Sequence, residues 1–124
     1  MYKILIVDDS STMRKIIKSV LVQAGFEIEH FIEASNGVEG LSSLIANPDV
    51  ELVLTDIQMP QMDGISFVKA VRTKHDAKSL PMFMISSDSG SVMLQNAMEY
   101  GANGHVSKPF TPESMRGVLE PYFG

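Results

Sequence analysis

Residues 3–9 read KILIVDD, a short apolar run rich in β-branched residues that ends in two acids. Such a run is typical of a strand buried on both faces of a sheet. The apolar residues after it recur at three- and four-residue steps, which places them on one stripe of a helix. These residues are Met13, Ile16, Ile17, Val20, Leu21 and Ala24. Ser10 or Ser11 can cap this helix, and Gly25 can end it in the left-handed conformation that glycine adopts at little cost.

This alternation of strand and helix patterns continues along the chain. Further strand patterns lie at residues 31–34, 52–55, 82–86 and 105–107. Helix patterns lie at 38–46, at 65–74, at 91–100 and from Pro112 onward, and we expect Pro121 to break or kink the last one. Five strand–helix units imply a parallel sheet, since right-handed crossovers cover both faces with helices. The sequence therefore predicts an α/β, flavodoxin-like doubly wound sandwich, with its ligand beyond the carboxyl ends of the strands.

The composition is that of one ordinary globular domain, with 124 residues, 44% of them hydrophobic and 20% charged. We therefore treat residues 1–124 as a single domain. The net charge of −5 argues against a nucleic-acid partner, which would normally face a basic surface. The absence of cysteine excludes disulfides and thiolate metal sites. The apolar run near the start is too short for a signal peptide or a membrane-spanning helix, so we expect a cytoplasmic protein without membrane contact.

Polar residues follow four of the predicted strands at the point where each strand ends. They are Asp8 and Asp9, Asp56, Ser86 and Ser87, and Lys108. Taken singly, each has a simpler explanation, because an acidic pair after a strand usually caps the next helix and a lysine before a proline usually lies on the surface. Taken together they indicate a site, because the carboxyl ends of parallel strands share one edge of the sheet.

Three carboxylates at one edge repel one another unless a cation joins them. Magnesium suits such a site, because it retains several waters and uses one or two carboxylates together with phosphate oxygens. An ammonium and a hydroxyl beside the ion are what a transferring phosphoryl group requires, and an aspartate can be the nucleophile. The pattern therefore predicts Mg²⁺-dependent phosphoryl transfer to an aspartate.

The motifs at these positions resemble the receiver domain of response regulators. They are ILIVDD at residues 4–9, Asp56 with Met-Pro at 59–60 and Asp-Gly at 63–64, Ser86, and Lys-Pro-Phe at 108–110. The run STMRK at 11–15 is similar to the chemotaxis, CheY-like type of this family. The resemblance covers essentially the whole chain and implies a five-stranded parallel sheet in the order 2-1-3-4-5.

The resemblance also assigns roles in binding the metal and the phosphoryl group. Asp56 matches the phosphoacceptor. Asp9 matches a direct Mg²⁺ ligand, and Asp8 matches a supporting acid that acts through water. Gln58 matches the residue that offers its backbone carbonyl to the ion, so its side chain is not the ligand.

Three further positions correspond to the part of the family that changes on phosphorylation. Lys108 matches the ammonium that pairs with the phosphoryl group, and a cis peptide bond to Pro109 is expected. Ser86 matches the hydroxyl that moves to meet that group. His105 stands where the family usually has Tyr or Phe, whose ring swings inward at this step. Imidazole can also fill the space and titrates near physiological pH, and before phosphorylation we expect it to lie outward or to sample both positions.

The resemblance implies a signalling module rather than an enzyme with an external substrate. The expected phosphodonor is a sensor histidine kinase, and the expected output is a downstream protein on the face of the fourth helix, fifth strand and fifth helix. The chain has no Lys or Arg between Ser79 and Ser107. Motor-binding chemotaxis relatives are lysine-rich there, which argues against the flagellar motor as the partner.

Two alternatives belong to other functional classes. A phosphohydrolase that works through an aspartyl phosphate needs a second acid two residues after the nucleophile, where this chain has Gln58. An FMN-binding flavodoxin needs hydroxyls and glycines after the first strand, where Asp8 and Asp9 would repel the phosphate. The sequence favours the receiver domain over both.

Overall fold

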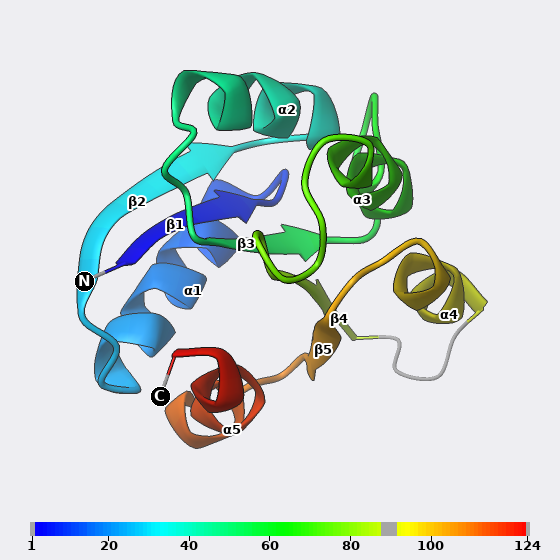
Figure 1. Cartoon of the computed structure of the whole chain (residues 1–124). Helices are drawn as coiled ribbons and strands as arrows, with labels where there is room; N and C mark the ends of the chain where they lie inside the picture. Colours follow the sequence, from blue (N-terminus) through cyan, green and yellow to red (C-terminus); the bar gives the residue numbers. More distant parts are fainter. Residues whose placement is uncertain (1, 88–91, 124) are drawn as a thin grey trace.

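The computed structural model describes residues 2–87 and 92–123, which form a three-layer α/β sandwich (Figure 1). One sheet of five parallel strands lies at its centre, in the order β2-β1-β3-β4-β5. The strands are β1 (Tyr2–Val7), β2 (Ile28–Ala34), β3 (Leu52–Asp56), β4 (Met82–Ser86) and β5 (Gly104–Ser107). This strand order and the doubly wound architecture confirm the predicted fold.

Helices connect successive strands and cover both faces of the sheet (Figure 1). They are α1 (Ser11–Gln23), α2 (Gly37–Ala46), α3 (Gly64–Arg72), α4 (Val92–Glu99) and α5 (Pro112–Phe123). α1 and α5 contact each other on one face, and α2, α3 and α4 follow one another on the other face. None of the helices in the described ranges is long and apolar enough to span a membrane.

The sheet is buried on both faces, so alternate residues of β1 enter two different cores. Leu5 and Val7 face α2, α3 and α4, where they join Phe67. Ile4 and Ile6 face α1 and α5. These four residues of β1 are at most 2% exposed. Burial on both sides explains why the first strand is continuously apolar rather than alternating.

The ends of α1 follow the signals in the sequence. The Oγ of Ser10 accepts a hydrogen bond from the Met13 N–H at 3.1 Å, so Ser10 rather than Ser11 is the N-cap. Gly25, beyond the other end of the helix, has a φ of 93°, which confirms the predicted left-handed conformation. The cap at Ser10 fixes the loop that carries the acids after β1.

Two elements differ from the prediction. β2 begins at Ile28 rather than at residue 31, because its first half exposes Glu29 and His30 at the edge of the sheet and so lacks a continuous apolar run. α5 continues through Pro121 instead of breaking there. Pro121 lies in the last turn, where its missing N–H removes a single intrahelical hydrogen bond near the end of the helix. The predicted start of α4 at residue 91 lies outside the described residues.

Candidate functional site

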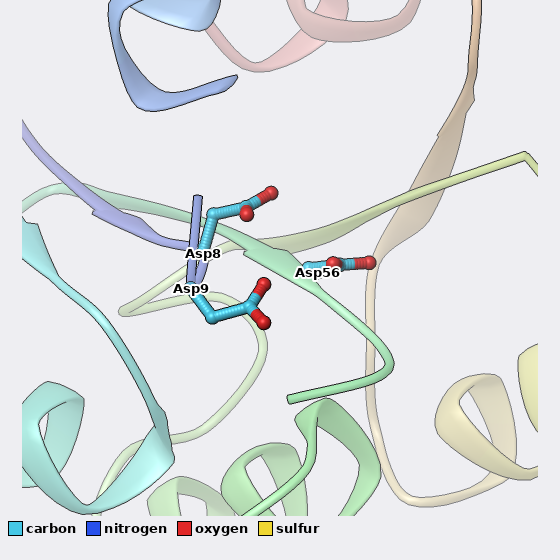
Figure 2. Close-up of side chains that lie close together, drawn as sticks. All are labelled: Asp8, Asp9 and Asp56. Carbon is cyan, nitrogen blue, oxygen red and sulfur yellow. The ribbon is translucent and has the colours of Figure 1, made fainter. Parts of the chain in front are cut away.

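Two adjacent strands bring three carboxylates together at the carboxyl edge of the sheet. β1 and β3 pair in parallel with Val7 opposite Thr55, so the acids that follow these residues become neighbours. One oxygen from each of Asp8, Asp9 and Asp56 lies within 4.8 Å of the other two (Figure 2). These three residues, called here the acidic cluster, confirm the predicted convergence.

Asp8 is the buried member of the cluster, with 2% of its surface exposed. The Ser10 N–H donates to its Oδ1 at 2.9 Å, whereas its Oδ2 is buried and has no hydrogen-bond partner among the described residues. Burial raises the pKa of the Asp8 carboxyl; the Ser10 hydrogen bond opposes this rise, and the charge of Asp56 adds to it. A buried carboxylate oxygen without a donor is destabilising on its own.

Asp56 lies between the other acids and a lysine. Its side chain is 17% exposed, and the Nζ of Lys108 lies 3.8 Å from its Oδ1. The Ile57 N–H donates to the same oxygen at 2.8 Å. Burial raises the pKa of the Asp56 carboxyl, and the charge of Lys108 is the main opposing influence. The peptide bond between Lys108 and Pro109 is cis, which confirms the expectation drawn from the family resemblance.

The acidic cluster fits a bound Mg²⁺ ion by its chemistry. It offers hard carboxylate oxygens, and one of them, Oδ2 of Asp8, is buried without a partner in the described structure. Asp9 is exposed, which leaves room for the waters that Mg²⁺ retains. The ion would relieve both the missing partner and the repulsion between like charges.

A cavity of about 420 Å³ opens beside the acidic cluster. It is lined by Asp56, Ile57, Gln58, Ser86, Ser87, Met93 and Lys108. Ser86 at the end of β4 and Lys108 after β5 therefore line the same cavity as Asp56, the predicted phosphoacceptor. A polar cavity with a cation beside a carboxylate suits a phosphoryl group.

Gln58 lies at the edge of this cavity. Its side-chain amide contacts the sulfur of Met93 on α4 at 3.8 Å. Its backbone N–H helps to hold down the pKa of Asp56 against the effect of burial. The role of its backbone carbonyl as a metal ligand stays a prediction.

His105 lies beside the end of β4 and is partly exposed to solvent. The residue is half-buried, and its Nε2 lies 3.4 Å from the carbonyl oxygen of Ser86. Ser86 is 7% exposed, and its carbonyl also accepts the Lys108 N–H at 2.9 Å. The ring thus contacts the backbone of the residue with which it is predicted to move, and the expectation that it lies outward or samples both positions stays a prediction. The switching roles of His105 and Ser86 stay predictions.

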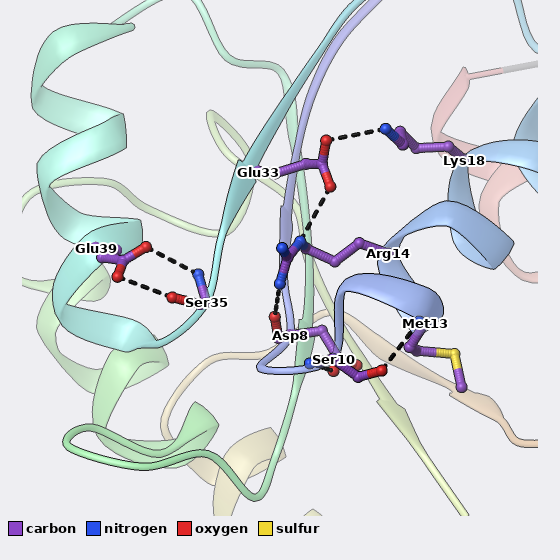
Figure 3. A network of polar contacts seen from close by, with 8 residues as sticks. All are labelled: Asp8, Ser10, Met13, Arg14, Lys18, Glu33, Ser35 and Glu39. Atoms are coloured by element: carbon purple, nitrogen blue, oxygen red, sulfur yellow. Dashed lines mark hydrogen bonds and ion pairs between the residues drawn. The ribbon is translucent and has the colours of Figure 1, made fainter.

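Sequence reasoning did not place Arg14 or Met93 at the site; it considered Met93 only as a candidate for a partner surface on the fourth helix. The Nη1 of Arg14 donates to the carbonyl oxygen of Asp8 at 2.5 Å (Figure 3). A hydrogen bond to a backbone carbonyl leaves no pattern in the sequence, and Arg14 entered the prediction only as part of the run STMRK. Met93 brings α4 to the cavity, a contact that depends on how the helix lies against the sheet.

Comparisons of the sequence and of the structure with known proteins agree on one family. Residues 4–120 match the family described as the response regulator receiver domain. The chemotaxis protein CheY1 of Helicobacter pylori is 42% identical over 122 residues, which cover 98% of this chain and 97% of that protein. The structure of the chemotaxis response regulator CheY4 of Vibrio cholerae superposes with a TM-score of 0.81 at 34% identity, covering 98% of each chain. A CheX–CheY–BeF₃–Mg²⁺ complex from Borrelia burgdorferi gives 0.85 at 26% identity, covering 99% of this chain and 90% of that chain.

Proposed function

This chain belongs to the response regulator receiver family, and we propose that it accepts a phosphoryl group on Asp56 from a histidine kinase, with Mg²⁺ held by the acidic cluster. The observation that carries the proposal is the position of Asp56. Its carboxylate lies within 4.8 Å of two other carboxylates and 3.8 Å from the Lys108 ammonium. A nucleophile between a cation site and a fixed ammonium is the arrangement that phosphoryl transfer requires.

In the proposed transfer, a carboxylate oxygen of Asp56 attacks the phosphorus of a phosphohistidine. The phosphorus–nitrogen bond breaks, the imidazole leaves, and an aspartyl phosphate forms. Lys108 neutralises the transferred charge, and the Ser86 hydroxyl, which lines the same cavity, donates to a phosphoryl oxygen. The acidic cluster and the Gln58 carbonyl hold Mg²⁺, which when bound supplies charge neutralisation and orients the phosphoryl oxygens.

The proposed output is a contact with a downstream protein on the face formed by α4, β5 and α5. Apolar side chains on α4 support a protein partner there, since Val92 and Met98 are 70% and 42% exposed. Relatives named as chemotaxis proteins, and a solved complex of one with CheX, support a role in chemotaxis signalling. We propose that the chain acts as one receiver domain in the cytoplasm, and not as an enzyme with an external substrate.

The test is labelling of the metal-free chain with radioactive acetyl phosphate, with and without added Mg²⁺. Wild type should be labelled only with Mg²⁺, and Asp56→Asn should not be labelled. Asp63→Asn is the matched control. Asp63 caps α3 by accepting the Ser66 N–H at 2.8 Å, and asparagine keeps that cap while removing the charge.

Undiminished labelling of Asp56→Asn would overturn the assignment. Rapid turnover of p-nitrophenyl phosphate by the wild type would instead favour a phosphohydrolase. Gln58 stands where that reaction needs an acid, and a carboxamide is not acidic enough to protonate a leaving group.

A further inference from the structure

Asp8 makes three hydrogen bonds, while its Oδ2 has no partner in the described structure. Its N–H donates to the carbonyl of Ala34 at 3.0 Å, and its Oδ1 accepts the Ser10 N–H at 2.9 Å. Its carbonyl accepts from the Nη1 of Arg14 at 2.5 Å (Figure 3). Of these three bonds, only the last comes from another residue's side chain. It is therefore the one that a substitution can remove without altering the backbone.

Arg14 is itself held in place by β2. Its Nε donates to the Oε1 of Glu33 at 3.0 Å, and its side chain is 17% exposed. Lys18 pairs with the other oxygen of Glu33 at 2.9 Å, so two cations of α1 share one carboxylate (Figure 3). Of these two cations, Arg14 is the one that is hydrogen-bonded to Asp8 in the structure. Because the guanidinium is planar and rigid, its bond to Glu33 sets the direction of its bond to Asp8.

We propose that Arg14 is a positioning residue of the metal site, whose bond to the Asp8 carbonyl orients the Asp8 carboxylate so that Oδ2 faces the acidic cluster. The inference rests on the proposed function, in that the cluster must bind Mg²⁺. The role is geometric rather than electrostatic, because Arg14 donates to the backbone carbonyl of Asp8, whereas the cation that acts on the pKa of the Asp8 carboxyl is Lys108. Mg²⁺ demands near-ideal octahedral geometry, and so its affinity depends on how rigidly each ligand is held.

The test is calorimetric titration of Mg²⁺, and separately of Ca²⁺, into the metal-free full chain. The variants are Arg14→Met, Arg14→Lys and Lys18→Met. Lys18→Met is the matched control, because it makes the same change in net charge and also removes one partner of Glu33, but leaves Asp8 untouched. Arg14→Lys keeps the positive charge but lacks the planar guanidinium that donates to both Glu33 and the Asp8 carbonyl. Urea unfolding checks that each variant is folded at the titration temperature.

We expect both Arg14 variants to bind Mg²⁺ about tenfold more weakly, in the range typical for residues that orient metal ligands. Lys18→Met should bind close to wild type. Ca²⁺, which accepts irregular geometry, should lose less affinity than Mg²⁺ in the Arg14 variants. Wild-type Mg²⁺ affinity in a folded Arg14 variant overturns the inference, as does an equal loss in Lys18→Met. If the wild type binds no Mg²⁺, the proposed function fails and this inference fails with it.

Discussion

Replacing Asp8 by asparagine should stabilise the metal-free chain while weakening the Mg²⁺ binding proposed for the acidic cluster. Asparagine keeps Oδ1 as the acceptor for the Ser10 N–H. It replaces Oδ2, the carboxylate oxygen that has no partner in the described structure, by an amide group that can donate. The substitution also removes one of three charges whose oxygens lie within 4.8 Å of one another. At an effective dielectric constant of about 20, one such pair repels by about 3 kcal/mol.

Part of this gain is lost, because the charge of Lys108 attracts the Asp8 carboxylate. We therefore expect a net stabilisation of about 2 kcal/mol, which for a domain of this size raises Tm by about 8 °C. The effect should depend on pH with a definite sign. Burial raises the pKa of Asp8 in the folded state above the usual 3.8, so the folded wild type binds more protons than the unfolded chain between these two values. Wild-type stability then falls as pH rises through that window, and the advantage of Asp8→Asn is largest at neutral pH.

The assay is urea unfolding of wild type and Asp8→Asn in a chelator, from neutral to acid pH, repeated with excess Mg²⁺. The advantage of the variant should shrink as acid protonates Asp8 in the wild type. Mg²⁺ should stabilise the wild type more than the variant. Asp76→Asn is the opposed control, because the Ser79 hydrogen bond lowers the pKa of Asp76, so loss of that charge should not stabilise the chain. A less stable Asp8→Asn at neutral pH, or an advantage that does not change with pH, would refute the reasoning.

Two other predictions concern glycines and the imidazole. Gly117→Ala should stabilise α5 by about 0.5–1 kcal/mol, because a Cβ there meets nothing within 4 Å. Gly64→Ala should destabilise the chain by more than about 2 kcal/mol, since its Cβ would come within 2.1 Å of the Asp56 carbonyl oxygen; thermal unfolding of both variants checks the contrast in sign. The His105 ring, which lies beside the Ser86 carbonyl, should change its NMR chemical shifts when a beryllofluoride mimic is added, because the Ser86 hydroxyl is expected to move toward the mimic and the ring to fill the space behind it. Identical shifts in both states would exclude His105 as the switch.

The fold was predictable because almost every element has a hydrophobic pattern that is typical of its type. β1 is continuously apolar, and the stripe on α1 recurs at helical steps, so each pattern agrees with the layer in which it lies. The misses fall where the local pattern is weak. The exposed Glu29 and His30 conceal the start of β2, and Pro121 is compatible with a helix when it sits in the last turn.

The sequence predicted which residues lie together at the site, but not how deeply each is buried or which hydrogen bonds hold it. The rule that ligands lie beyond the carboxyl ends of parallel strands brought Asp8, Asp9, Asp56 and Lys108 to one edge. It could not show that Asp8 is buried whereas Asp9 is exposed, because this depends on how the loop after β1 turns. It also could not show the bond from Arg14 to the Asp8 carbonyl, because every residue has a carbonyl and the sequence does not mark which one accepts.

In the part of the chain that the structure describes, the acidic cluster combines a buried polar atom without a partner with like charges that lie close together. Burial raises the pKa of both Asp8 and Asp56, and each such rise makes the ionised, metal-free state less stable. The same features suit the proposed divalent cation, which would supply a partner for Oδ2 of Asp8 and reduce the repulsion between the carboxylates. Stability and function should therefore oppose each other here: neutral substitutions in the cluster should stabilise the metal-free chain in proportion to the Mg²⁺ affinity they remove. At Gly117, which lies in α5 and outside the acidic cluster, a stabilising substitution should leave Mg²⁺ binding unchanged. Comparing the two kinds of variant therefore separates a loss of stability that is linked to metal binding from one that is not.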